Sequence, residues 1–283
     1  MLKIAVQKSG RLYDESLTLL KSCGLYVDNG MDQLKAEVRG FPAEVYFLRN
    51  SDIPQYLEDG VVDIAIIGEN VLYEQKVGVE VLVKLGFSKC RLSIAVPKNM
   101  HYDGIESLHG KKIATSYPNS VQKFLDEAGV LAEIHIISGS VEIAPNIGLA
   151  DAICDLVSSG STLFKNGLEE KEIILKSESC LAANVASLNT KRDIINDLVF
   201  RIESVLKARD NRYILFNIPN EKIAEASAVL PVLKSPTVLP LIDEGWSSLH
   251  SVINVKDFWD VIKNLKKIGA QGILVVPVEN MVV

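Results

Sequence analysis

The segment Glu142-Ile-Ala-Pro-Asn-Ile-Gly-Leu-Ala-Asp-Ala-Ile-Cys-Asp-Leu-Val-Ser-Ser-Gly-Ser-Thr-Leu163 joins a short apolar run to a loop of small hydroxylated residues. The run Ala152–Val157 predicts a buried strand with Asp155 near its end, and a helix is expected after the loop. Such a unit can hold a sugar phosphate. Backbone N–H groups and Ser/Thr hydroxyls bind the phosphate, Gly160 allows close approach, and the carboxylate accepts hydrogen bonds from ribose hydroxyls. Ser and Gly are also common in ordinary turns, so the short pattern fits either a phosphate-binding loop or a plain strand–turn–helix.

Strand-like and helical stretches alternate through the first part of the chain. This alternation predicts an α/β fold with parallel sheets that bind ligands at the carboxyl ends of their strands. The loop is not a Walker loop, because no Gly-Lys-Ser/Thr follows its glycine, and no GxGxxG precedes it. The predicted strands are Leu2–Val6, Glu44–Leu48, Val62–Ile67, Leu92–Val96 and Lys112–Thr115, and the predicted helices are Asp14–Ser22, a helix capped by Ser51 or Asp52 that runs to Leu57, and Val121–Ala128.

From Tyr213 onward the order of elements changes to β-α-β-β-α-β, which is typical of a ferredoxin-like module. Residues 207–211 are predicted to link this module to the rest of the chain. Small modules of this type often sense metabolites, an inference by analogy of fold. The predicted elements are the strand Tyr213–Ile218, the helix Glu221–Leu230, the strands Thr237–Leu241 and His250–Asn254, the helix Asp257–Ile268 and the strand Gly272–Pro277.

Length and composition limit the classes of protein to consider. The chain has 283 residues, 48% of them hydrophobic, which suits two or three compact units. Its net charge of −6, without a polybasic run, argues against nucleic acid or an anionic membrane as the main partner. The N-terminus turns polar too early for a signal peptide, and the four cysteines are widely spaced, so we expect a cytoplasmic protein with reduced thiols. The four histidines have no metal-ligand spacing, and no protein metal site is predicted.

Several cations and polar residues at predicted strand ends could bind phosphates. Lys8 and Arg11 lie in the first strand–helix turn, and Arg49 follows a strand; each could instead be a solvated surface residue. Arg91 and Lys112 could also serve, or could simply flank their strands. Other features with two interpretations are Gly68, which could be needed only for a tight turn, and the hydroxyls and aromatic face of Thr115-Ser116-Tyr117-Pro118, which could meet a nucleobase or only begin a helix.

The longer segment from Glu142 to Leu163 resembles the phosphoribosyl-binding segment of the ATP phosphoribosyltransferase family, and the resemblance covers nearly the whole chain. Ser235-Pro-Thr-Val-Leu-Pro240 and Ile268-Gly-Ala270 extend it into the C-terminal module, as in the long form of the family. The other matching segments are Ile4–Leu12, Leu48–Pro54, Gly60–Asp63, Ile66–Leu72, Cys90–Ser93 and Ile113–Pro118.

The resemblance implies both a reaction and an architecture. ATP and 5-phosphoribosyl 1-diphosphate would give N1-(5-phosphoribosyl)-ATP and diphosphate with Mg²⁺, the first step of histidine biosynthesis. Two periplasmic-binding-protein-like lobes (1–89 with 176–207, and 90–175) would form the catalytic body. A ferredoxin-like βαββαβ domain (208–283) would bind histidine as a feedback inhibitor. Members of the family shift between a dimer and a hexamer, and AMP can inhibit alongside histidine.

Residue roles follow from the same resemblance. Asp155, Arg11 and Arg49 are expected to be catalytic. Phosphoribosyl diphosphate is expected to contact Asp151, Ala152, Asp155, Ser158, Ser159, Gly160, Ser161 and Thr162. ATP is expected to contact Lys8, Gly10, Arg11, Gly68 and Tyr117, and histidine to contact Ser235, Thr237 and Ala270.

One position departs from a wider pattern. Many phosphoribosyltransferases carry two acids before a similar loop, and here Cys154 occupies the first of those places. Glu142 or Asp151 could supply the second carboxylate, and the sequence leaves this open. A non-catalytic bilobed nucleotide- or metabolite-binding regulatory protein is the alternative function.

Overall fold

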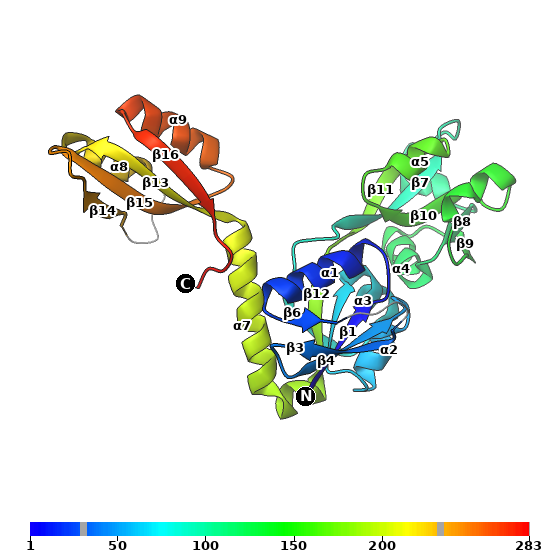
Figure 1. Ribbon diagram of the computed structural model, residues 1–283. Coiled ribbons are helices and arrows are strands. Elements are labelled where there is room, and N and C mark those ends of the chain that lie inside the picture. Colours follow the sequence, from blue (N-terminus) through cyan, green and yellow to red (C-terminus); the bar gives the residue numbers. More distant parts are fainter. Residues whose placement is uncertain (29–32, 231–234, 283) are drawn as a thin grey trace. The chain divides into compact units, whose positions relative to one another are not determined.

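The computed structural model describes residues 1–28, 33–230 and 235–282 (Figure 1). The chain divides into two compact units, Met1–Asn196 and Asp197–Val283. The predicted division into two lobes and a regulatory domain stays a prediction as to its bounds. The predicted linker at residues 207–211 differs from the structure, because α7 (Arg192–Arg209) includes its first three residues and β13 begins at its last, Asn211. Lys, Ala and Arg favour helix, which accounts for the continuation.

The first lobe contains a seven-stranded sheet in the order β2-β3-β4-β1-β5-β12-β6. Its centre is parallel, with β1 between β4 and β5. On one side β12 is antiparallel to both β5 and β6, and on the other side β3 is antiparallel to β4. The strands are β1 (Leu2–Gln7), β2 (Tyr26–Val27), β3 (Lys35–Arg39), β4 (Ala43–Leu48), β5 (Ile64–Gly68), β6 (Val79–Lys84) and β12 (Ser179–Asn184), and the helices are α1 (Arg11–Ser22), α2 (Ile53–Glu58), α3 (Glu69–Gln75) and α6 (Val185–Thr190).

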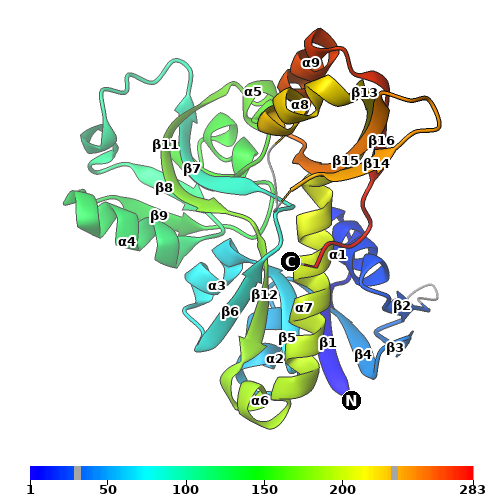
Figure 2. The same ribbon diagram turned by 90° about the vertical axis from the view of Figure 1, so that its left-hand side faces the viewer.

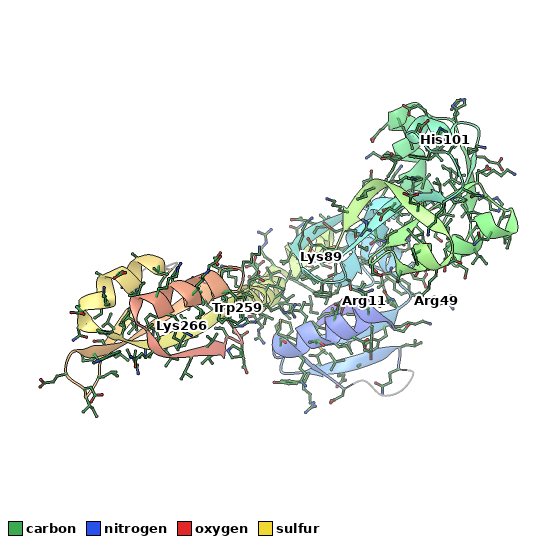
Figure 3. All side chains as sticks on the ribbon, turned by 90° about the horizontal axis from the view of Figure 1, so that it is seen from above. Arg11, Arg49, Lys89, His101, Trp259 and Lys266 are labelled. Atoms are coloured by element: carbon green, nitrogen blue, oxygen red, sulfur yellow. The ribbon has the colours of Figure 1, made fainter. Side chains whose placement is uncertain are left out.

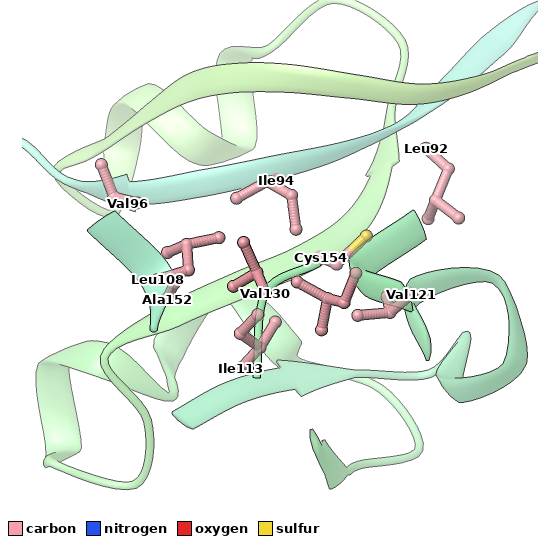
Figure 4. Close-up of a cluster of buried hydrophobic side chains, with 10 residues drawn as sticks. Leu92, Ile94, Val96, Leu108, Ile113, Val121, Val130, Ala152 and Cys154 are labelled. Atoms are coloured by element: carbon pink, nitrogen blue, oxygen red, sulfur yellow. The ribbon is translucent and has the colours of Figure 1, made fainter. Parts of the chain in front are cut away.

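The second lobe contains a five-stranded sheet in the order β11-β7-β10-β8-β9. β10, β8 and β9 are parallel, while β7 and β11 are antiparallel to their neighbours. Figure 4 shows the cluster of buried side chains on one face of this sheet. The elements are β7 (Cys90–Pro97), β8 (Lys112–Thr115), α4 (Pro118–Ala128), β9 (Glu133–Ile136), β10 (Ala152–Val157), α5 (Ser161–Lys165) and β11 (Leu168–Ser177), with 3-10 turns at Ile105–Leu108, Val141–Ile143 and Pro145–Ile147.

Two crossover segments join the lobes, residues 85–89 on the way out and Glu178 on the way back. The two segments hydrogen-bond to each other. Leu85 N donates to Ser179 O at 2.9 Å, and Ser179 N donates to Phe87 O at 3.1 Å. A second connection comes from helices, because α3 of the first lobe lies beside α4 of the second (Figures 1 and 2).

The C-terminal unit contains a four-stranded antiparallel sheet in the order β14-β15-β13-β16. Helices α8 and α9 pack on one face of the sheet and close a core around Phe216 and Leu265 (Figure 2). The chain order is therefore βαββαβ, as predicted. The elements are β13 (Asn211–Pro219), a 3-10 turn at Asn220–Lys222, α8 (Ile223–Val229), β14 (Thr237–Pro240), β15 (Trp246–Asn254), α9 (Phe258–Ile268) and β16 (Gln271–Pro277).

The predicted fold class is confirmed, and β8 and β10 have the predicted bounds. Two helices begin earlier than predicted. α1 starts at Arg11 because Gly10, with φ of 89°, ends the preceding turn there. α4 starts at Pro118, since proline is favoured in the first helical turn. Asp52 precedes α2 as predicted but makes no side-chain capping bond. In the described part of the chain, helices are too short or too polar to cross a membrane.

Candidate active site

The loop after β10 borders a cavity of about 270 Å³ in the second lobe. Its lining combines two carboxylates, Glu142 and Asp155, with the small hydroxylated residues of the loop. Five of the predicted phosphoribosyl-contact residues therefore surround one space with Asp155. The lining residues are Glu142, Asp155, Leu156, Val157, Ser158, Ser159, Gly160, Ser161, Thr162 and Leu163.

The loop owes its shape to Gly160 and to hydrogen bonds between its serines. Gly160 has φ of 78°, a left-handed conformation in which other residues are strained, while a Cβ atom there would meet only Val157 Cγ1 at 4.0 Å. The glycine is thus required by the backbone conformation. Ser159 Oγ donates to Ser161 Oγ at 3.1 Å. Because α5 has only five residues, its dipole adds little, and N–H groups and hydroxyls of the loop are the anion-binding groups.

Asp155 lies half-buried beside Glu142. Burial raises the pKa of Asp155. The N–H of Leu156 donates a hydrogen bond to Asp155 Oδ1 at 2.7 Å and lowers this pKa, whereas the negative charge of Glu142 raises it. The net direction is upward. A carboxylate whose ionisation is opposed by burial and by a neighbouring acid suits a site that receives hydroxyl donors or a cation.

Cys154 packs in the core and faces away from the cavity. Successive side chains of a strand point to opposite faces, so Asp155 and Cys154 cannot both face the loop cavity. Cys154 is fully buried among Leu92, Ile113 and other apolar residues (Figure 4), and burial raises the pKa of its thiol well above the ordinary value. Position 154 therefore contributes packing, and a second acid must come from another element.

Asp151 and Ala152 lie at the other end of β10 from the loop. The Asp151 carboxylate accepts a hydrogen bond from Lys112 N at 2.9 Å and lies 3.8 Å from Lys111 Nζ, where β8 begins. Ala152 is buried in the core cluster. The structure does not bring either residue to the loop cavity. Of the two acids that the sequence left open, Glu142 is the one beside Asp155.

The cations predicted in the first lobe gather at one edge of its sheet. Because β1 and β4 are parallel partners, with Gln7 opposite Leu48, the residues that follow them are neighbours, and Lys8 N donates to Leu48 O at 2.9 Å. Lys8, Arg11 and Arg49 are exposed, and Gly10 precedes α1. Figure 3 labels Arg11 and Arg49. This edge carries three cations at the carboxyl ends of parallel strands, where α/β folds bind ligands.

Gly68 ends β5 in an extended conformation, with φ of −75°, so the tight-turn interpretation is wrong. A Cβ atom at this position would lie 2.4 Å from Asn70 Oδ1. Asn70 is buried and accepts a hydrogen bond from Ser177 Oγ at 3.0 Å, and its Nδ2 atom donates to the Tyr117 hydroxyl at 3.4 Å. Glycine is needed here because Asn70 occupies the space.

Tyr117 connects the two halves of the candidate site. It precedes α4, and its N–H donates to Thr115 Oγ1 at 2.9 Å. Burial raises the pKa of its hydroxyl, and the nearby charge of Asp155 raises it further. Tyr117 is thus neutral and hydrogen-bonded to Asn70 of the first lobe while lying near Asp155 of the second.

A second cavity, of about 420 Å³, lies at the crossover segments and shares Ser158 with the first. Its lining includes four cations and two acids. Lys84 pairs with Glu69 at 2.9 Å, and Arg91 pairs with Glu170. The sequence pattern contains no signal for Lys89, which precedes β7, or for Lys176, which lies within β11. The lining residues are Glu69, Lys84, Lys89, Cys90, Arg91, Ser158, Lys176, Ser177 and Glu178.

The sequence profile described as ATP phosphoribosyltransferase matches residues 49–204, which include the loop, Tyr117 and both crossover segments. The chain belongs to the ATP phosphoribosyltransferase family. The family's second profile, described as HisG, C-terminal domain, matches residues 208–280, the span of the βαββαβ unit.

Relatives extend the match to the whole chain. An ATP phosphoribosyltransferase of Cytophaga hutchinsonii is 53% identical over 282 residues and covers 100% of this chain and 99% of its own length. One from Phocaeicola vulgatus is 50% identical, with 100% of both chains covered. Among solved structures, the ATP phosphoribosyl transferase (HisG:HisZ) complex of Thermotoga maritima contains a chain with a TM-score of 0.65 and 30% identity, covering 73% of this chain and 99% of that one.

The three residues expected to bind the effector lie at two edges of the C-terminal sheet. Ser235 and Thr237 are exposed, and Thr237 begins the edge strand β14, opposite His250 of β15. Ala270 precedes β16 at the opposite edge, in a groove of about 390 Å³ that also includes Phe258 and Lys266. Because β15 and β13 separate these edges, one copy of the unit does not bring the three residues together.

Proposed function

We propose that this chain transfers the phosphoribosyl group of 5-phosphoribosyl 1-diphosphate to N1 of ATP, the first step of histidine biosynthesis. The products are N1-(5-phosphoribosyl)-ATP and diphosphate. The observation that supports this most directly is the loop cavity, where hydroxylated residues and the left-handed Gly160 adjoin two carboxylates in a chain of this family.

In this proposal the 5-phosphate lies on the loop from Ser158 to Thr162. Asp155 and Glu142 accept hydrogen bonds from the ribose hydroxyls. The adenine nucleotide lies near Tyr117 and Gly68, with its phosphates toward Lys8, Gly10, Arg11 and Arg49. As the bond to diphosphate breaks, the anomeric carbon gains oxocarbenium character and N1 attacks from the opposite face. Positioning and charge neutralisation provide most of the rate, and no covalent intermediate is needed.

Mg²⁺ is the cofactor we propose, held mainly by diphosphate oxygens and water, in keeping with its reluctance to lose its hydration shell. The residues present fit this arrangement. Asp155 and Glu142 place two carboxylates at the ribose end of the cavity, and the pKa of Asp155 is raised by burial. When bound, Mg²⁺ would neutralise the departing diphosphate.

Regulation by histidine belongs to the C-terminal unit in this proposal, with AMP as a second inhibitor. A site that uses Thr237 and Ala270 together needs more than one copy of the chain, because they lie at opposite sheet edges. This supports self-association, and the form we propose for it is a dimer that changes to a hexamer. The expected location is the cytoplasm, where ATP and the diphosphate substrate are made.

The reaction is tested by mixing the protein with ATP, 5-phosphoribosyl 1-diphosphate, Mg²⁺ and a diphosphatase. Formation of the N1-substituted adenine is measured by its near-ultraviolet absorbance. A rise in absorbance that histidine suppresses supports both the transferase and the sensor. A rise that is indifferent to histidine keeps the enzyme and removes the effector assignment. A folded chain that binds ATP and gives no product would favour the non-catalytic regulatory protein.

A further inference from the structure

Arg91 connects three strands of the second lobe through one guanidinium group. Its Nε and Nη2 atoms each donate to a carboxylate oxygen of Glu170 on β11, both at 2.5 Å. Its Nη1 atom donates to the carbonyl oxygen of Ser158 at 3.1 Å. Ser93 Oγ also donates to Glu170, at 2.7 Å, and so holds the carboxylate in place. β7, which carries Arg91, lies between β11 and β10 in the sheet, so the network runs from Glu170 to the residue that begins the loop.

The contact with Ser158 constrains the peptide group that follows it. In a planar trans peptide the C=O and the next N–H point in opposite directions. With the Ser158 carbonyl turned toward Arg91, the N–H of Ser159 is turned away from it. Ser158 lines both cavities, while Arg91 lines only the larger one at the crossover segments. The N–H of Ser159 therefore points away from Arg91 and the larger cavity, which is the orientation needed to bind an anion in the loop cavity.

We propose that Arg91 is a positioning residue, which sets the conformation of the phosphate-binding loop from behind through Ser158 and is itself oriented by Glu170. This rests on the proposed function, because the loop's ligand is taken to be the 5-phosphate of the ribosyl substrate. Arg91 would act on affinity for that substrate without contacting it.

Arginine is specifically suited to this task. The planar guanidinium presents donors in several fixed directions, so it can hold a carboxylate with two N–H groups and a carbonyl with a third. A lysine has the same charge but cannot reproduce that geometry. The side chains of Arg91 and Glu170 are 29% and 24% exposed, so the attraction between the two charges is partly screened, and the shape of the fork is what matters.

If Arg91 instead contacted the diphosphate directly, the substitution Glu170→Gln would have the opposite effect on substrate affinity. Glu170 neutralises part of the positive charge of Arg91 in their ion pair. If Arg91 attracted the substrate directly, Glu170→Gln would free its charge and tighten binding. If Arg91 positions the loop, Glu170→Gln loosens the fork and weakens binding.

The experiment compares Arg91→Lys, Glu170→Gln and the double variant in the full chain, by steady-state formation of the N1-substituted adenine. Each single variant should raise KM for 5-phosphoribosyl 1-diphosphate about tenfold, the effect of losing ~1.4 kcal/mol. It should raise the inhibition constant of ribose 5-phosphate similarly and leave KM for ATP within about twofold. The double variant should resemble the single ones, because both break the same network.

Arg39→Lys is the matched control. Arg39 holds Asp28 with the same two-bond fork, at 2.8 Å each, on the first lobe and far along the sequence from the loop. Its KM values should equal those of the wild type. Wild-type KM in Arg91→Lys, or a lower KM in Glu170→Gln, would overturn the proposal while the transferase assignment stood. Absence of product from the folded wild type would instead refute the proposed function.

Discussion

Asp155 and Asp63 show how the same residue type is tuned in opposite directions. Asp155 lies half-buried beside Glu142, and its pKa is raised chiefly by burial. Asp63 is 4% exposed, and burial raises the pKa of its carboxyl, but hydrogen bonds from Lys191, the Lys3 N–H and Ser187 outweigh that effect and lower it. The first arrangement costs stability and belongs to the candidate site. The second stabilises the fold.

Asp155→Asn should lower turnover by orders of magnitude and raise the melting temperature at pH 7. A carboxyl whose folded pKa is raised contributes stability below its unfolded pKa, near 4, and loses it as pH rises through the folded value. Asparagine removes the cost of burying a charge, and it also replaces one of the two oxygens that would accept ribose hydroxyls by an N–H donor. Calorimetry at several pH values should show the gain in melting temperature shrinking as pH falls toward 4. Near-normal turnover would remove Asp155 from the site.

At the scale of secondary-structure elements, helix α4 takes its N-terminal cap from the other lobe. Tyr117, which precedes it, provides no side-chain cap. Glu74 on α3, 8% exposed, accepts from Asn119 N and Ser120 N at 2.8 Å each and from Ser120 Oγ at 2.6 Å. A carboxylate at a helix N-terminus stabilises it by hydrogen bonds and by its charge. This contact joins the lobes beside Tyr117.

Glu74→Gln should destabilise the first unit by about 1–3 kcal/mol, the usual cost of weakening a buried charge-assisted network. It should also raise KM for ATP, because Tyr117 loses support. Calorimetry and steady-state kinetics measure the two effects. Gln122→Ala, which removes a bond to Asp126 from the exposed face of the same helix, is the control and should change neither. A variant as stable as the wild type would show that the hydrogen bonds from Asn119 and Ser120 to Glu74 do not stabilise the unit.

A second anchor joins α6 to the sheet. Asp63, just before β5, accepts from Lys3 N of β1 at 2.8 Å, from Ser187 Oγ at 2.7 Å and from Lys191 Nζ at 2.7 Å. Loss of the Asp63 carboxylate would disrupt this buried network of hydrogen bonds, while Lys191, with a side chain 34% exposed, would remain partly hydrated.

Asp63→Asn should therefore lower the free energy of unfolding by about 1–3 kcal/mol at pH 7. Because the folded pKa of Asp63 lies below the ordinary value of 3.8, the stabilisation is complete above that pH and is lost as pH falls through the folded value. The melting temperatures of variant and wild type should thus differ at pH 7 and converge in acid. A constant difference across pH would mean that the carboxylate charge plays no part.

At the scale of the whole molecule, the candidate active site and the proposed effector site lie in separate compact units. An effector bound to the C-terminal unit can change catalysis only by favouring one of two states of the assembly. The opposite edges occupied by Thr237 and Ala270 suggest that those states differ in how copies associate.

Thr237→Ala should weaken histidine inhibition, about tenfold in inhibition constant for the loss of hydrogen bonds worth ~1.4 kcal/mol. The uninhibited rate should stay unchanged, because Thr237 lies outside the catalytic unit. Rate against histidine concentration, with light scattering to follow oligomer size, gives both quantities. Unchanged inhibition would defeat the assignment of Thr237.

The sequence alone determined the βαββαβ order, the bounds of β10 and the loop that follows it, because apolar periodicity and turn-forming residues act over a few neighbours. Strand alternation even contained the signal that Cys154 and Asp155 face opposite sides. Only the tertiary structure decided that Glu142 rather than Asp151 meets Asp155, that Glu74 caps α4, and that Arg91 holds Ser158. These partners lie far apart along the chain or on different elements. Their meeting depends on strand order and lobe packing, which local pattern does not encode.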